Sequence, residues 1–206
     1  MAHTECIRKQ RYKRSLYPNL LIACIASECK QEEVILHPKI VVKEDTNLQC
    51  SETNCSQRTF IMRWNPEISS LKIRDFENGM ECFLDRDFYY DWSIWDYEKV
   101  SIGDRFYMVT VGNQQNGIVM SGTIVSMPYK DVDWSGKGRD VRYVRMNPEC
   151  MIHPNNSPLI LSSSELSKAI PSFNWNEGHS GELLNEQQAI LLDALWVSHF
   201  DRFAYK

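Results

Sequence analysis

The stretch from Phe106 to Met146 constrains the fold of this chain more than any other. Its apolar and β-branched runs, typical of strands, cover residues 106–111, 118–125 and 141–146. Residues 112–117, Gly-Asn-Gln-Gln-Asn-Gly, separate the first two runs as a hairpin turn would. A glycine-containing loop, 128–139, leads into the third run. The stretch therefore predicts three neighbouring strands with a long loop between the second and third.

Further strands and helices are expected on both sides of this stretch. Phe60–Trp64 reads as a compact apolar strand that Asn65-Pro66 ends, because proline removes a backbone donor and restricts its predecessor. Three helix starts are predicted from capping side chains: Ser69, Ser162 with Glu165 at the capping-box position, and Asn185, whose helix should run through Trp196. Strands outnumber helices and follow one another. We therefore expect an α+β fold, a mostly antiparallel, barrel-like sheet with helices packed outside.

Residues 1–57 differ in composition from the rest of the chain. We expect them to form an N-terminal extension to a single domain, 58–206. Four cysteines in this extension have the spacing C-x4-C, twenty residues, C-x4-C: Cys24, Cys29, Cys50 and Cys55. Paired cysteines on two turns can bind zinc. The turns lack the glycines of a zinc ribbon, so small core residues are the favoured interpretation, and we predict no metal.

The seven cysteines also bear on the compartment. An odd number in a chain too large to depend on disulfides indicates reduced thiols and a cytoplasmic protein. A competing pattern is the basic segment 8–14 followed by the apolar residues 20–24, whose end fits a lipoprotein cleavage sequence. Pro18 and Asn19 interrupt that apolar run, so a short buried segment is favoured. No run is long enough to span a bilayer, and no membrane partner is predicted.

The familiar catalytic motifs fail in this sequence. Gly178–Glu182 has a glutamate where a nucleophile elbow ends in glycine, and Gly136-Lys-Gly138 lacks the upstream glycine of a phosphate loop. The five histidines show no metal-ligand spacing. We therefore predict no catalytic residues and no cofactor. A net charge of −4 argues against a protein that coats nucleic acid through charge alone, but not against one that grips a single nucleotide.

Tryptophans at strand ends or in loops provide the stronger signal. Flat rings outside the core can sandwich a base or hold a methylated group, although about half of such tryptophans serve as core. We interpret Trp64 as core, Trp95 and Trp134 as stacking residues, and His179 as a second wall. Asn65, Ser93 and Ser135 would contact the base edge, and Lys137 and Arg139 the phosphates. The predicted ligand-binding residues are thus Asn65, Ser93, Trp95, Trp134, Ser135, Lys137, Arg139 and His179.

The order of these motifs resembles the PUA-like group, specifically its EVE and YTH branches. The matching segments are Phe60–Trp64 as first strand, Ser93-Ile-Trp95 as aromatic segment, Val100–Asp104 as the turn before a central strand, Gly117–Gly122 as return strand, and Trp134–Arg139 followed by Val141–Val144 as the YTH-like loop. The resemblance covers residues 60–196. It implies a PUA-like β-barrel that takes one modified base into an aromatic pocket.

We therefore expect a nucleic-acid-binding module whose partner is DNA or RNA carrying a modified base. Two alternatives stay open. One is an enzyme on the same barrel acting on a modified nucleoside or small amide, with His179 or a nearby carboxylate as base. The other is a non-catalytic protein-interaction domain whose aromatic loops meet another protein. The choice between DNA and RNA, the modification and the oligomeric state are not determined by the sequence.

Overall fold

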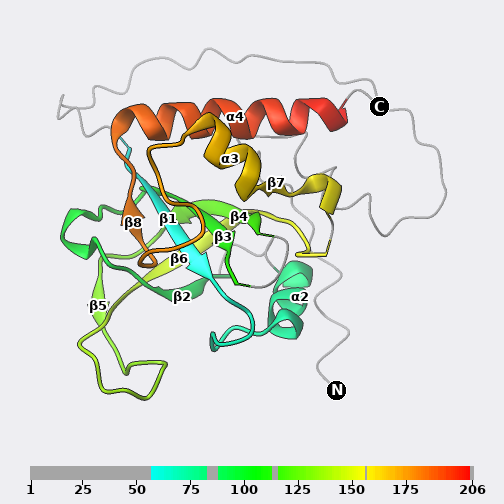
Figure 1. The fold of residues 1–206 in the computed structure, drawn as a ribbon. Coiled ribbons are helices and arrows are strands. Elements are labelled where there is room, and N and C mark those ends of the chain that lie inside the picture. The colour runs from blue at the N-terminus through cyan, green and yellow to red at the C-terminus, as the bar shows by residue number, and fades with distance from the viewer. Residues whose placement is uncertain (1–56, 83–87, 113–115, 156, 205–206) are drawn as a thin grey trace, which may run out of the picture.

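The computed structural model describes residues 57–82, 88–112, 116–155 and 157–204. The four cysteines with zinc-like spacing and the signal-like segment lie outside these residues. The described strands form one sheet with the order β2-β6-β4-β3-β1-β8, to which β5 is added beside β6 and β7 beside β4. Figure 1 shows this curled sheet with the helices outside it.

The strands are β1 (Thr59–Trp64), β2 (Tyr90–Ser93), β3 (Arg105–Thr110), β4 (Gly117–Ile124), β5 (Tyr129–Lys130), β6 (Arg142–Met151), β7 (Leu161–Ser162) and β8 (Glu182–Leu183). The helices are α2 (Ile73–Cys82), α3 (Ser163–Ala169) and α4 (Glu186–Ala204), with short 3-10 turns η2 (Tyr97–Lys99) and η3 (Ser157–Leu159). In this part of the chain, no helix combines the length and apolarity needed to cross a membrane.

The sheet is mixed and mostly antiparallel, as the sequence predicts. β1 and β3 form the parallel pair, with Phe60 beside Phe106 and Trp64 beside Thr110. The predicted hairpin is the antiparallel pair β3–β4. All other pairs, including β4–β6 and β2–β6, are antiparallel. The α+β class and the barrel-like, curled sheet are therefore confirmed.

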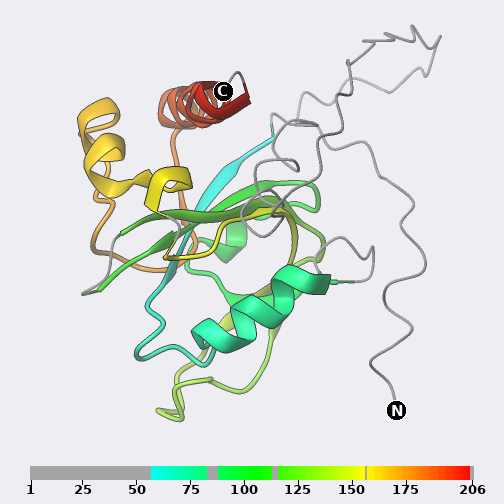
Figure 2. The same ribbon diagram turned by 90° about the vertical axis from the view of Figure 1, so that its right-hand side faces the viewer.

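Helices cover the sheet from two sides. α3 and α4 lie together on one side, and α2 lies on the other (Figures 1 and 2). Trp64 is fully buried and stacks on Phe76 of α2, with ring centroids 4.8 Å apart. Under α4, Trp196 packs edge-on against Tyr107, with ring centroids 5.4 Å apart. The interpretation of Trp64 as a core residue is confirmed.

The two outer strands of the sheet meet at a seam, formed by Trp95–Asp96 after β2 and Ser180–Gly181 before β8. The Trp95 N–H donates to the Ser180 carbonyl at 2.9 Å, and the Asp96 N–H donates to the Gly181 carbonyl at 3.1 Å. The Asp96 carboxylate also accepts the Leu183 N–H at 2.9 Å. These bonds bring the curled sheet round on itself, so the strand ends of β2 and β8 lie side by side.

The helix caps follow the predictions more closely than the helix lengths do. The Ser162 hydroxyl and the Glu165 carboxylate form the expected reciprocal capping box of α3. Asn185 caps α4 by accepting the Gln188 N–H at 2.9 Å. The predicted end of α4 at Trp196 is wrong, because the helix runs to Ala204. Its last turns are held by Phe200, which is buried and packs edge-on against Trp196.

We predict that Gly122→Ala destabilises the fold. A Cβ at Gly122 would lie far inside the van der Waals contact distance from the Asn147 carbonyl oxygen and 2.9 Å from the Pro148 Cα, both on the backbone of the neighbouring β6. Overpacking against backbone that cannot move away costs about 1–3 kcal/mol. Urea unfolding measures the loss. The matched control Thr123→Ala, on the same strand and only half-buried, should lose less. Equal losses would contradict the prediction.

Candidate functional site

The most distinctive surface feature is a stacked ring pair at the seam. The Trp95 indole and the His179 imidazole lie parallel, with centroids 3.7 Å apart and planes 6° from one another. Trp95 is 59% exposed and His179 is also exposed. An indole held in the open at stacking distance from a second ring presents a flat, apolar surface to solvent. The structure thus brings together two of the predicted ligand-binding residues.

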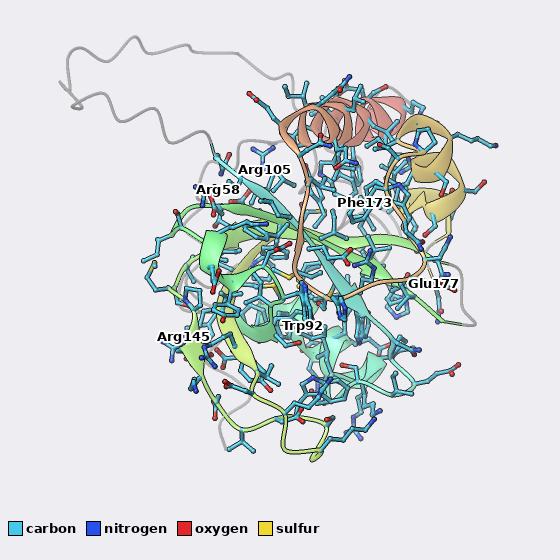
Figure 3. The ribbon with its side chains drawn as sticks, turned by 60° about the vertical axis from the view of Figure 1, so that its left-hand side comes forward. Arg58, Trp92, Arg105, Arg145, Phe173 and Glu177 are labelled. Atoms are coloured by element: carbon cyan, nitrogen blue, oxygen red, sulfur yellow. The ribbon has the colours of Figure 1, made fainter. Side chains whose placement is uncertain are left out.

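The pair is held from below by Ser180. Its hydroxyl oxygen accepts the Trp92 indole N–H at 2.8 Å and the Arg63 backbone N–H at 3.0 Å. Trp92 is buried beside the segment that leads into β8 (Figure 3). One hydroxyl therefore joins β1, β2 and the loop that carries His179. Trp92 is therefore a buried supporting residue rather than an exposed ring.

Arg63 fastens the same loop to β1. Its side chain is 4% exposed, and it forms an ion pair with Glu182 at 2.8 Å. The guanidinium also donates to the carbonyl of His179 and, at 2.6 Å, to that of Asn174. Phe173 covers it, with the guanidinium carbon 5.3 Å from the ring centroid. A buried guanidinium requires such partners, so its presence determines the path of residues 173–182.

Two glycines let this loop approach the sheet closely. Gly178 has φ of 129°, and a Cβ there would meet the Arg63 guanidinium and the Glu182 carboxylate at 2.9 Å. Gly181 has φ of 80°, and a Cβ there would lie 2.5 Å from Ile94. Only glycine combines this backbone conformation with the absence of a side chain. His179 and Ser180 are therefore presented between two positions that tolerate no Cβ.

The loop that carries Trp134 is organised by a residue that sequence reasoning did not single out, Asp133. Its carboxylate is almost fully buried and accepts the Ser135 hydroxyl at 2.8 Å and the Arg139 backbone N–H at 3.1 Å. The Arg139 guanidinium donates to both of its oxygens, at 2.9 and 3.1 Å. The aspartate with a serine two residues later is the signal for such a turn.

The charge balance of this loop follows from the same contacts. The hydrogen bonds from the Arg139 guanidinium, helped by the backbone N–H groups of Ser135 and Arg139, hold the pKa of Asp133 well below that of an ordinary aspartate, although burial acts in the opposite direction. Arg139 also lies over Trp134, with its guanidinium carbon 5.8 Å from the ring centroid. The charge of Arg139 is therefore balanced by Asp133, although the side chains of both Arg139 and Lys137 are exposed.

Tyr143 connects this loop to β2. Its hydroxyl accepts the Trp134 N–H at 3.0 Å and donates to the Val132 carbonyl at 2.8 Å. On the neighbouring strand Tyr143 lies directly opposite Ser93. Ser93, Trp95 and the Trp134 loop therefore belong to adjoining segments of one side of the molecule. In the described part of the chain, no ring contact joins the indoles of Trp95 and Trp134. Trp95 instead stacks on His179, and Trp134 lies under the Arg139 guanidinium.

Asn65 has a different environment from the other predicted residues. Its side-chain oxygen accepts the Glu67 N–H at 3.0 Å, and its amide lies against Gly112. It thus shapes the turn after β1. Sequence reasoning also missed Arg63, because nothing in Phe-Ile-Met-Arg-Trp indicates that the charge is buried. Among the described residues, no group of three His, Cys, Asp or Glu side chains could hold a metal ion.

Several solved structures are similar to this chain. A hypothetical protein from Leishmania major has 11% identity, with 69% of this chain and 96% of that chain covered and a TM-score of 0.48. Human THYN1 in complex with 5-methylcytosine-containing DNA has 13% identity, coverage of 68% and 98%, and a TM-score of 0.49. The Mmi1 YTH domain in complex with RNA has 14% identity, coverage of 71% and 81%, and a TM-score of 0.45.

No family model and no curated protein matches the sequence. One of the similar structures is a YTH domain, a branch that the sequence is expected to resemble. At such identities and TM-scores these likenesses do not transfer a ligand to this chain. What the site can bind has to follow from its own residues.

We predict that Ser180→Ala weakens the fold and loosens the ring pair. Two buried N–H groups, from Trp92 and Arg63, would lose their acceptor, and each unsatisfied donor costs about 1–3 kcal/mol. Urea unfolding measures the stability, and the His179 ring proton shifts report the stacking. Ser164→Ala, at an exposed position on α3, serves as control. A Ser180→Ala protein as stable as this control would refute the role of the hydroxyl.

A second prediction concerns pH. The pKa of Asp133 is lower in the folded protein than in the unfolded chain. The contribution of its carboxylate to the free energy of unfolding is therefore fully present above the unfolded-state pKa, and it is lost only as the pH falls through the lower, folded-state pKa. The Trp134 indole N–H resonance should therefore stay unchanged from pH 7 to about pH 4, near the ordinary aspartate pKa. In Asp133→Asn it should already be shifted at pH 7, and in the exposed control Asp131→Asn it should not. A wild-type transition centred near pH 4 would contradict this.

Proposed function

We propose that the protein is a nucleic-acid-binding module that stacks one modified base of DNA or RNA on Trp95. The observation that carries the proposal is the exposed Trp95 indole, held parallel to His179 at 3.7 Å. That separation and orientation are those of stacked aromatic rings, and base–aromatic stacking contributes about 1–3 kcal/mol per base. His179 covers one face of the indole, so the other face is the one offered to a base.

Rigidity supports this role. The backbone on both sides of the ring pair is bonded across the seam, and Ser180 lies on the buried Trp92 and on β1. A ring already held in place loses little freedom when a ligand binds, so more of the stacking energy appears as affinity. This matters because taking a base out of a duplex costs a few kcal/mol.

The neighbouring polar groups fit a nucleotide. Ser93, two residues before Trp95 and half-exposed, is the residue that we expect to contact the base edge. The Trp134 loop, tied to Tyr143 opposite Ser93, supplies Lys137 and the half-exposed Arg139 for phosphates. A methyl group on the base adds one buried carbon, worth about 0.8 kcal/mol, which corresponds to about a fourfold preference for the methylated base.

We predict that Trp95→Ala raises the Kd for a single strand with one methylated base by about 5- to 150-fold, the loss of one stacking interaction. Fluorescence anisotropy of labelled strands measures the Kd, with matched unmodified strands beside them. Among the similar structures, the human protein is in complex with methylated DNA and the YTH domain with RNA, which makes DNA and RNA the first probes to compare.

The control is Ile190→Ala, an exposed apolar residue on α4, on the helical side of the sheet. It should leave the Kd unchanged, because that helix takes no part in the ring pair. If Trp95→Ala binds as well as the wild type, or if Ile190→Ala weakens binding equally, the proposed function fails. Turnover of a modified nucleoside that is lost in His179→Ala would instead favour the enzyme alternative.

A further inference from the structure

We propose that Tyr89, Arg145 and Tyr129 form a second nucleotide-binding subsite, which receives the single strand flanking the base at Trp95. The inference rests on the proposed function and extends it, because it gives the ligand a length and a path over the sheet. It concerns the outer side of β2, β5 and β6, on the part of the molecule away from α3 and α4, where Arg145 projects (Figure 3).

The alternation of β2 places this subsite on the same side as Trp95. Trp92 points inward and is buried, whereas Asp91 is exposed and Ser93 is half-exposed. Two more side chains point outward with Asp91 and Ser93. Tyr89, 42% exposed, precedes the strand, and Trp95 follows the buried Ile94. Trp95 lies six positions after Tyr89, which in extended chain is a span of roughly 20 Å.

Arg145 is the centre of the cluster. It lies opposite Asp91 in the β2–β6 register, and its Nε is 3.6 Å from an Asp91 oxygen. Its guanidinium carbon is 4.6 Å from the Tyr89 ring centroid and 6.0 Å from that of Tyr129. The side chain is 50% exposed. A planar cation held between two aromatic rings, with its edge in solvent, is suited to stacking and to phosphate.

Tyr129 and Asp91 keep this arrangement in place. The Tyr129 hydroxyl donates to the same Asp91 oxygen that faces Arg145. Burial, and then the Asp91 carboxylate, raise the pKa of Tyr129, so the hydroxyl remains a donor at all physiological pH. Asp91 thus offsets the charge of Arg145 when no ligand is bound. A phosphate would compete with this carboxylate for the guanidinium.

A single-stranded nucleic acid is the occupant that these features favour. Sheet faces that carry aromatic rings bind successive bases of single strands by stacking. On the same face of β6, Tyr143 lies two residues from Arg145 in the alternation; it lies directly opposite Ser93 on β2 and Tyr129 on β5. The outward-facing row therefore runs from Tyr89 and Arg145 past Ser93 to Trp95 at the seam.

The span determines the probe. A stacked strand advances about 3.4 Å per nucleotide, so roughly 20 Å corresponds to about six nucleotides on either side of the central base. The experiment compares a trinucleotide and a 13-nucleotide single strand, each with the methylated base in the middle. The central position removes any dependence on strand polarity. Wild type, Tyr89→Ala, Arg145→Ala, Asp91→Asn and the control Arg74→Ala, an exposed arginine on α2, are measured.

We expect the longer strand to bind wild type more tightly, and Tyr89→Ala to weaken only that strand, by about fivefold or more. Arg145→Ala should also lower the slope of log Kd against log salt by about 0.7 for the longer strand, the loss of one phosphate contact. Asp91→Asn keeps an acceptor for the Tyr129 hydroxyl but removes the negative charge that competes with phosphate, so it should lower the Kd of the longer strand. Arg74→Ala should change nothing.

The outcomes separate this inference from the proposed function. If both strands bind equally and Trp95→Ala still weakens both, the second subsite is refuted and the proposed function stands. If the longer strand keeps its advantage in Tyr89→Ala and Arg145→Ala, the flanking nucleotides use another surface and the second subsite is refuted. If neither strand binds, both proposals fail.

Discussion

The arrangement of the candidate site depends on one buried charge, the Arg63 guanidinium. Placed on β1 and nearly sealed from solvent, it draws the Glu182 carboxylate and two loop carbonyls to itself. A cation in such a place would be strongly destabilising without these partners. The loop that carries His179 therefore cannot leave the sheet without exposing or orphaning that charge. The exposed Trp95–His179 ring pair is therefore held rigid by the buried contacts of the Arg63 guanidinium.

The second determinant is the way in which the sheet comes round on itself. Regular pairing ends at Ser93 and begins again at Glu182, and the seam between these points uses irregular backbone bonds. Irregular backbone is where a chain can expose a large aromatic side chain while keeping its polar groups paired. Trp95 lies in such a segment. Its neighbour Ile94 is buried, and the Asp96 N–H is bonded across the seam, so the backbone is anchored on both sides of the indole.

Much of the scaffold could be predicted from residue patterns. The runs 60–64, 106–111 and 118–125 correspond to β1, β3 and β4 within one or two residues, because apolar, β-branched segments bounded by glycine and proline admit few other structures. β6 is longer than predicted, since Pro148 sits at an irregularity in its pairing with β4 and so does not end the strand. The parallel pairing of β1 with β3 joins residues more than forty positions apart, and no local signal encodes it.

The site was predictable in its residue types but not in its partnerships. Exposed Trp95 and Trp134, the glycine-flanked His179 and the basic loop all follow from composition and turn chemistry. Trp95 and Trp134 are both predicted as stacking residues, whereas the structure stacks Trp95 on His179 and places Arg139 over Trp134. Those partnerships depend on Asp133, Tyr143 and Arg63, which lie far from one another or have ordinary local sequences. Only tertiary packing brings them together.

The seam has a further consequence for the behaviour of the protein in concentrated solution. An open sheet leaves rows of unpaired N–H and C=O groups that recruit strands from other molecules and lead to aggregation. Here the two terminal strands, β2 and β8, are only four and two residues long, and the segments beside them satisfy each other's backbone groups. The contacts that hold Trp95 in position thus also leave little template for edge-to-edge polymerisation between copies of the chain.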